Sequence, residues 1–182
     1  MEVQSSSSDL IETQITSDNT TPIHKLYDNW TLWAHLPHDV NWSVSSYKKI
    51  ATLDSLEASI TILETLPEKM INNCMLFLMR NTILPMWEDP KNINGGSFSY
   101  KISNKCVSKV WKKLSYSLIG EVLTEDKKLR PNITGITISP KKNFCIIKVW
   151  ISNRDNQNPS CINEIEGGIQ PTGCIFKKHT SS

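Results

Sequence analysis

The chain has 182 residues, a length typical of one domain with a substantial core. Its net charge of +2 is too small to bind duplex DNA by bulk electrostatics, and no apolar run approaches the roughly 18 residues of a membrane span. We therefore expect neither DNA nor a membrane as partner. The N-terminus lacks a signal-peptide pattern, and the five scattered cysteines, without CxxC spacing, indicate reduced thiols. Both features predict a cytoplasmic protein.

The N-terminal stretch, residues 1–22, is rich in Ser, Thr, Asp and Asn, which predicts a disordered tail. One folded domain is then expected over residues 23–182. Its first strand is predicted at Trp30–Ala34. A helix follows, with Asp54 as the N-cap and Glu57 as its capping-box partner, and Pro67 ends it.

The rest of the chain alternates between apolar strands and two further helices. One helix is predicted from about Asn104 to Gly120, on an apolar stripe at helical spacing. A short third helix is predicted between Asn158 and Gly168, from its capping residues. Strands are expected at residues 74–79, 97–103, 133–139, 144–152 and 173–177, with a hairpin at residues 140–143. Antiparallel strands interleaved with three helices predict an α+β fold with the helices on one face of the sheet.

Six tryptophans are the most informative residues. Trp30, Trp33 and Trp111 occupy apolar patterns and are expected in the core. Trp42 instead follows a polar loop, and Trp87 stands between Pro85 and the acidic pair that begins at Glu88. A capped, solvent-lined turn would explain such a setting. An aromatic ring beside a carboxylate also suits a flat cationic ligand with N–H donors, such as a methylated guanine.

The order of these residues resembles a known family. The segments that recur are His24–Leu26, Trp30–Trp33, Pro85–Asp89 with Lys91 and Asn92, Gly95–Gly96, Trp111, Leu118–Glu121 and Trp150. Together they resemble the messenger-RNA cap-binding translation initiation factor 4E family over about residues 24 to 178. The resemblance implies a curved antiparallel sheet with three α-helices on its convex face and a ligand slot on the concave side.

The resemblance also implies the residues that would hold the cap. Trp42 and Trp87 would stack on the two faces of 7-methylguanine, and Glu88 would accept hydrogen bonds from its N1–H and 2-amino groups. Trp150 would contact the N7-methyl group. Methylation makes the base cationic, so each of these contacts favours the methylated over the unmethylated guanine.

The match is weaker where the family binds the cap phosphates. Lys141 aligns with one phosphate-binding arginine, with poorer bidentate geometry. A second arginine is replaced by Ser97, and the family lysine on the following strand is replaced by Ile146. We expect Lys142 or Lys148 to compensate.

The largest departure falls on the helical back face, where family members bind a scaffold helix of the Tyr-x-x-x-x-Leu type. Ile60 replaces the exposed family tryptophan, Lys25 replaces a proline, Lys112 and Lys113 replace a Leu–Glu pair, and Tyr116 replaces a leucine. Loss of a hot-spot indole costs about 2 kcal/mol or more, so the usual scaffold should bind poorly. The predicted partner face comprises His24, Leu26, Leu56, Ile60, Lys112, Lys113 and Tyr116.

From these features we expect a monomeric cap-binding protein that brings capped messenger RNA to translation through a non-standard scaffold. A repressor or decoy that binds caps without the usual scaffold is the alternative. No placed nucleophile, phosphate-binding loop or Cys–His pair indicates an enzyme, and no cofactor is expected. His35 and His38 have metal-like spacing but lie in a proline-containing loop without carboxylates, so no metal site is expected.

Overall fold

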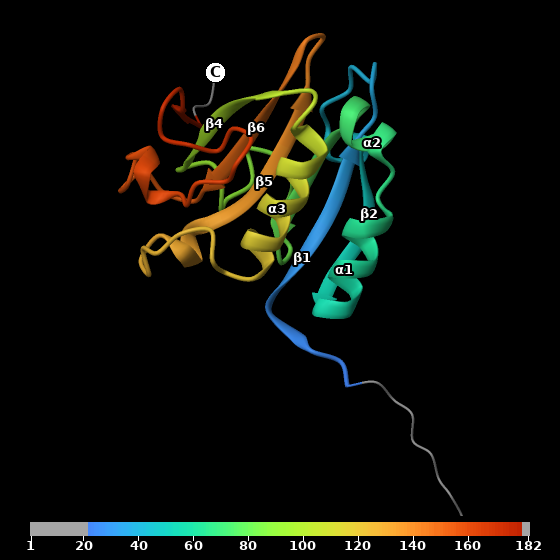
Figure 1. The fold of residues 1–182 in the computed structure, drawn as a ribbon, viewed down its shortest axis with the longest axis horizontal. Helices are drawn as coiled ribbons and strands as arrows, with labels where there is room; N and C mark the ends of the chain where they lie inside the picture. The colour runs from blue at the N-terminus through green and yellow to red at the C-terminus, as the bar shows by residue number, and fades with distance from the viewer. Residues whose placement is uncertain (1–21, 180–182) are drawn as a thin grey trace, which may run out of the picture.

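The computed structural model describes residues 22–179 as an open antiparallel sheet with helices on one face (Figure 1). The predicted disordered tail lies, apart from Pro22, outside the described residues. Seven strands pair in the order β2-β1-β3-β5-β6-β4-β7. They are β1 (Lys25–His35), β2 (Tyr47–Ser55), β3 (Met75–Arg80), β4 (Gly96–Ser103), β5 (Ile133–Pro140), β6 (Phe144–Ile151) and β7 (Ile175–Lys178). The α+β class predicted from the sequence is confirmed.

Three α-helices, α1 (Leu56–Thr65), α2 (Glu68–Asn73) and α3 (Val107–Ile119), lie together on one side of the sheet (Figure 1). The main core fills the space between them and the strands. The predicted stripe of α3 is buried there, as are the inward side chains of β4. Fully burying one such aliphatic or aromatic side chain contributes about 1.5–3 kcal/mol. The buried residues of these two elements are Val107, Val110, Trp111, Leu114, Leu118, Phe98, Tyr100 and Ile102.

The sequence analysis missed two elements, β2 and α2. β2 is an edge strand whose Lys48 and Lys49 are exposed, and its pairing with β1 contains register irregularities. Charged residues and bulges are common on edge strands because they discourage pairing with other chains, and here they obscure the alternating pattern. α2 has six residues, too few to show a helical repeat.

The predicted third helix at Asn158–Gly168 is wrong. Only a 3-10 turn forms, at Pro159–Cys161 (η3), although Asn158 caps it as expected. The following backbone bonds to the loop after α3 instead: the N–H of Asn163 donates to the Leu123 carbonyl at 2.9 Å. The chain then turns at two glycines with positive φ and closes an Ile165–Ile169 bridge.

The first predicted helix is correct, but its cap is not Asp54. The side chain of Ser55 accepts the backbone N–H of Ala58 at 3.3 Å and is the N-cap. Pro67 ends the helix as predicted and is itself the N-cap position of α2. Within residues 22–179, no helix is both long and apolar enough to cross a membrane.

Candidate nucleotide-binding site

The face of the sheet opposite the helices carries a second aromatic cluster. Phe77, Met79 and Trp150 form its buried centre. Trp33 belongs to this cluster, because it pairs with Phe77 across β1 and β3. Of the three tryptophans expected in the core, Trp30 and Trp111 lie in the main core, whereas Trp33 packs against this second cluster. Half-buried side chains that complete the cluster are Trp33, Tyr47, Met75, Ile83 and Trp87.

Trp42 is 53% exposed and stacks on a side chain of β1. Its indole stacks on the His35 ring with centroids 4.1 Å apart and planes at 3°. His35 is buried, lies within 2.8 Å of the Asn41 carbonyl through Nε2, and meets Tyr47 edge-on. One indole face is thus occupied by histidine, and the exposure leaves area for a second flat ring. The sequence analysis considered His35 only as a metal ligand and missed this contact.

Trp87 and Glu88 lie in the β3–β4 loop, which two side chains hold in shape. The Asp89 carboxylate accepts the Leu84 N–H at 2.9 Å and the Lys91 N–H at 2.8 Å. Asn92 is fully buried and donates to the Leu84 and Met86 carbonyls. Asp89 and Asn92, which belong to the segment that resembles the family, therefore stabilise the conformation of the loop.

The Glu88 side chain is exposed beside the aromatic cluster. Glu88 directly follows Trp87, which packs against the same cluster as Tyr47. Burial raises the pKa of Tyr47, and the negative charge of Glu88 raises it further. A ring lying against this cluster would have an open acceptor within reach.

Trp150 is only 6% exposed. It packs on Phe77 and Met79, and the His179 ring lies 4.8 Å from it. Nδ1 of His179 lies within hydrogen-bonding distance, 2.8 Å, of the Asn92 backbone carbonyl. Only a small part of the Trp150 indole is therefore open to a ligand.

Beside the aromatic cluster lies a groove of about 400 Å³ over β4, β5, β6 and β7, the lysine groove. Lys141 and Lys148, two of the lysines expected to hold the cap phosphates, line it together with Lys101 and Lys177. Burial lowers the pKa of Lys148, and because these lysines line one groove, the charges of Lys177 and Lys141 lower it further. Lys142 is exposed at the hairpin and does not line the groove. The other residues that line the lysine groove are Ser99, Ser139, Phe144, Ile146, Gly173 and Ile175.

The predicted partner face lies on α1, α3 and the start of β1. Leu56 and Ile60, one helical turn apart on α1, are 43% and 44% exposed. Several polar side chains of this face form hydrogen bonds or ion pairs with other residues of the same chain. Glu64 accepts Lys112 Nζ at 2.7 Å and the Tyr116 hydroxyl at 2.8 Å, which ties α1 to α3.

Two further contacts complete this face. Nδ1 of His24 lies 2.6 Å from the Glu57 carboxylate, and Lys113 lies 3.5 Å from Glu166. Leu26 is half-buried against the core. The lysine charges predicted for the partner face are therefore partly neutralised by carboxylates of the same chain.

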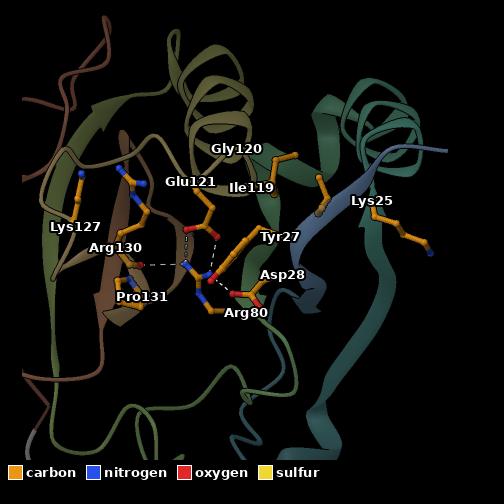
Figure 2. Close-up of a pocket in the computed structure, with 11 residues that line it drawn as sticks. Lys25, Tyr27, Asp28, Arg80, Ile119, Gly120, Glu121, Lys127, Arg130 and Pro131 are labelled. Atoms are coloured by element: carbon orange, nitrogen blue, oxygen red, sulfur yellow. Dashed lines mark hydrogen bonds and ion pairs between the residues drawn. The ribbon is translucent and has the colours of Figure 1, made fainter. Parts of the chain in front are cut away.

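A larger cavity, about 580 Å³, lies at the end of α3 beside the start of β1 (Figure 2). Arg80 joins its walls: Glu121 accepts its guanidinium at 2.7 and 3.1 Å, and Asp28 accepts it from the opposite side. The guanidinium also lies 4.4 Å from the Trp30 ring centre. Every strong donor of Arg80 is used within the chain, so this residue joins β1, β3 and the end of α3.

An aromatic slot next to a lysine groove can stack a flat base and hold its phosphates. The family model for eukaryotic initiation factor 4E matches residues 25–178, and the chain belongs to that family. Translation initiation factor 4E-2 of Schizosaccharomyces pombe is 30% identical over 144 residues, 74% of this chain and 56% of the relative. A 4E homolog of Acanthamoeba polyphaga mimivirus is 27% identical over 165 residues, 78% of this chain and 56% of the relative.

Solved structures agree with this assignment. A schistosome eIF4E complexed with m7GpppG and a 4E-binding protein is similar with a TM-score of 0.67 and 25% identity, covering 74% of this chain and 75% of that one. Caenorhabditis elegans eIF4E-3, bound to the protein Mextli and a cap analog, has a TM-score of 0.66 at 22% identity and supports the fold; 75% of this chain and 78% of that chain are covered. The chain spans 56% to 64% of the length of the first curated relatives it matches.

Proposed function

We propose that this protein binds the 7-methylguanosine cap of messenger RNA at the aromatic cluster. The observation that carries the proposal is the gathering of Trp42, Trp87 and the open Glu88 carboxylate around one sheet face. Family membership supports it, since the schistosome relative was solved with m7GpppG. The protein acts by binding and is not an enzyme.

Stacking supplies the affinity for the base. Each aromatic contact with a base contributes about 1–3 kcal/mol. The positive charge of 7-methylguanine adds a cation–π term of about 0.5–2 kcal/mol. Trp42 offers the ring face not covered by His35, and Trp87 offers the second plate. Trp150, with little exposed surface, contributes at most an edge contact to the N7-methyl group.

Glu88 supplies the recognition of the guanine edge. Its carboxylate accepts the N1–H and 2-amino groups, and the cationic ring makes these bonds charge-assisted. A neutral guanine would lose this assistance and the cation–π term together. The selectivity for methylated caps thus follows from one charge.

The cap triphosphate is assigned to the near end of the lysine groove. Lys141 and Lys148 line it without a carboxylate within 4.0 Å anywhere in residues 22–179. Lys142, next to Lys141 on the hairpin, makes at most an outer contact.

The proposal is tested by substituting Trp42, which stacks on the base, and Glu88, which accepts its hydrogen bonds, in separate variants. Trp42→Ala should weaken binding of both nucleotides, because both bases stack, and should weaken 7-methyl-GTP more, because the cation–π term is lost as well. Glu88→Gln should weaken 7-methyl-GTP more than GTP, because the charge-assisted bonds are lost. Asp155→Asn, at an exposed acid outside the aromatic cluster, is the control. If Glu88→Gln binds both nucleotides as the unmodified protein does, the assignment of the guanine acceptor fails.

For the back face we propose a scaffold or regulator that differs from the usual 4E partner, in a cytoplasmic, monomeric protein that promotes initiation. A cap-binding repressor or decoy is the second candidate, favoured by the Glu64 bonds to Lys112 and Tyr116 that occupy this face. Exposed Leu56 and Ile60 still offer apolar contact area to a helix.

A Tyr-x-x-x-x-Leu peptide separates the usual binding mode from these alternatives. The unmodified protein should bind it weakly, and Ile60→Trp combined with Lys113→Glu should bind it more tightly by restoring an indole and a carboxylate. Tight binding by the unmodified protein would show that its back face is an ordinary family surface.

A further inference from the structure

The lysine groove extends past the two lysines assigned to the cap phosphates. In the sheet register, Lys148 lies opposite Ser99, and Lys101 lies two residues further along β4, opposite Ile146. Lys177 lies opposite Ser97 on the next strand, β7. Because a strand rises about 3.4 Å per residue, neighbouring lysines are separated by roughly 7 Å along the strands. The cations are therefore spread over β6, β4 and β7.

These charges are not compensated inside the chain. Within residues 22–179, neither Lys101 nor Lys177 has a carboxylate within 4.0 Å, whereas the lysines of the helical face pair with Glu64 and Glu166. The ammonium of Lys101 lies over the Phe144 ring, 4.6 Å from its centre. A cluster of unpaired cations attracts a polyanion.

A buried hydroxyl in the same groove also lacks a partner. Ser99 is 9% exposed, lines the groove, and its Oγ has no hydrogen-bond partner among the described residues. It stands between Lys148 on β6 and Ile175 on β7. A buried hydroxyl without a hydrogen bond is costly, and a phosphate oxygen in the groove would accept one.

Apolar side chains separate the cations. Phe144, Ile146 and Ile175 line the same groove and offer contact surface to sugars and bases. A positively charged groove with interspersed aromatic and apolar surface is typical of sites for single-stranded nucleic acid. A free phosphate or a small nucleotide would not need this length.

The groove is also continuous with the site of Trp42. A neighbouring cavity of about 250 Å³ is lined by His35 and Trp42, and it shares Ser139 and Lys141 with the lysine groove. A chain that leaves the base slot past Lys141 therefore enters the groove directly.

We propose that the far part of the lysine groove, with Lys101 and Lys177, binds the sugar–phosphate backbone of the first transcribed nucleotides after the cap. Recognition is of single-stranded RNA without base preference, because the charged contacts are to phosphates. This inference rests on the proposed cap function, because the cap bound at Trp42 sets the direction in which the RNA enters the groove. It adds a second binding segment, so capped RNA binds more tightly than the cap alone.

The test compares 7-methyl-GTP with a capped oligonucleotide of about eight residues, within the usual site size of single-strand grooves. Dissociation constants are measured between about 50 and 200 mM salt for the unmodified protein and for Lys101→Gln/Lys177→Gln. The capped oligonucleotide should bind the unmodified protein more tightly than 7-methyl-GTP at low salt. Each lost phosphate contact reduces the salt slope of single-strand binding by about 0.7, so the double variant should lose about 1.4.

The matched control is Lys127→Gln/Lys128→Gln, which removes two exposed charges beyond the end of α3 and should leave the slope unchanged. Binding of 7-methyl-GTP should be the same in all three proteins. Equal affinity of the unmodified protein for the cap and the capped oligonucleotide would overturn the proposal. An equal loss for both ligands in the Lys101/Lys177 variant would also overturn it, because these lysines would then hold the cap's own phosphates.

The outcome also separates this inference from the cap proposal. If the protein binds uncapped RNA through Lys101 and Lys177 but shows no preference for 7-methyl-GTP over GTP, RNA binding in the groove stands. The proposal of cap binding at the aromatic cluster then fails.

Discussion

Trp42 stacks on His35, and we expect this contact to fix the orientation of the indole. Stacked aromatic pairs contribute about 0.5–1.5 kcal/mol, which corresponds to roughly two- to tenfold in affinity when the pair holds a binding plate. His35→Ala should therefore weaken 7-methyl-GTP binding by about this factor. His35→Phe, which keeps a flat ring under the indole, should restore most of the loss. If His35→Ala binds 7-methyl-GTP as tightly as the unmodified protein, the histidine does not position the plate.

Candidate site residues can be selected from sequence where they stand together in one short segment. Trp87 and Glu88 could be selected because proline and acids beside an indole are unusual in a core. His35 and Asn92 could not, since their roles depend on contacts formed by folding. Asn92, for example, bonds through its carbonyl to His179, which is 87 positions away. Likewise, the placement of Lys101 and Lys177 in one groove follows only from the strand register.

At the level of single elements, the start of α1 offers a direct stability test. Ser55→Ala removes the hydroxyl that accepts the Ala58 N–H, and loss of an N-cap typically costs about 1 kcal/mol of unfolding free energy. Asp54→Ala, the neighbouring acid favoured by the sequence pattern, should cost less. Urea denaturation of both variants measures the difference. A larger loss for Asp54→Ala would show that the aspartate caps the helix.

The elements that were predicted correctly have clear periodicity. The α3 stripe and the alternation of β4 are visible in sequence because one face of each is buried in a continuous core. β2 has no such pattern because it is an edge strand with lysines, and α2 is too short. The false helix at Asn158–Gly168 had proper end signals, but its backbone groups found partners in another loop.

For the molecule as a whole, carboxylates govern the response to acid. Hydrogen bonds from Lys112 and Tyr116 lower the pKa of Glu64 below its ordinary value of 4.5, and a bond with His24 lowers that of Glu57. Groups with a depressed folded pKa contribute stability that is present above the unfolded pKa and is lost as pH falls through the folded value. The urea midpoint should therefore be steady near neutrality and fall below about pH 4.5.

Glu64→Gln tests the origin of this acid dependence. The variant should be less stable near neutral pH and should lose less stability on acidification, because one linked carboxylate is gone. A midpoint that rises between about pH 5 and pH 3 in the unmodified protein would contradict the linkage.

The fold of the whole molecule was predictable because alternating strands and apolar helices allow few α+β arrangements. The sequence also predicted three helices, but the third is α2 and not the segment before β7. The separation of the tryptophans onto two sheet faces needed the structure, since Trp30 and Trp33 are three residues apart on one strand.

The central claim is that two indoles and one carboxylate select a cationic base. Titration of intrinsic tryptophan fluorescence with 7-methyl-GTP and with GTP tests it most directly. A cation–π term at each plate and charge-assisted bonds to Glu88 predict strong quenching by 7-methyl-GTP, with an affinity at least about tenfold above that for GTP. Equal quenching and equal affinity for the two nucleotides would contradict the account.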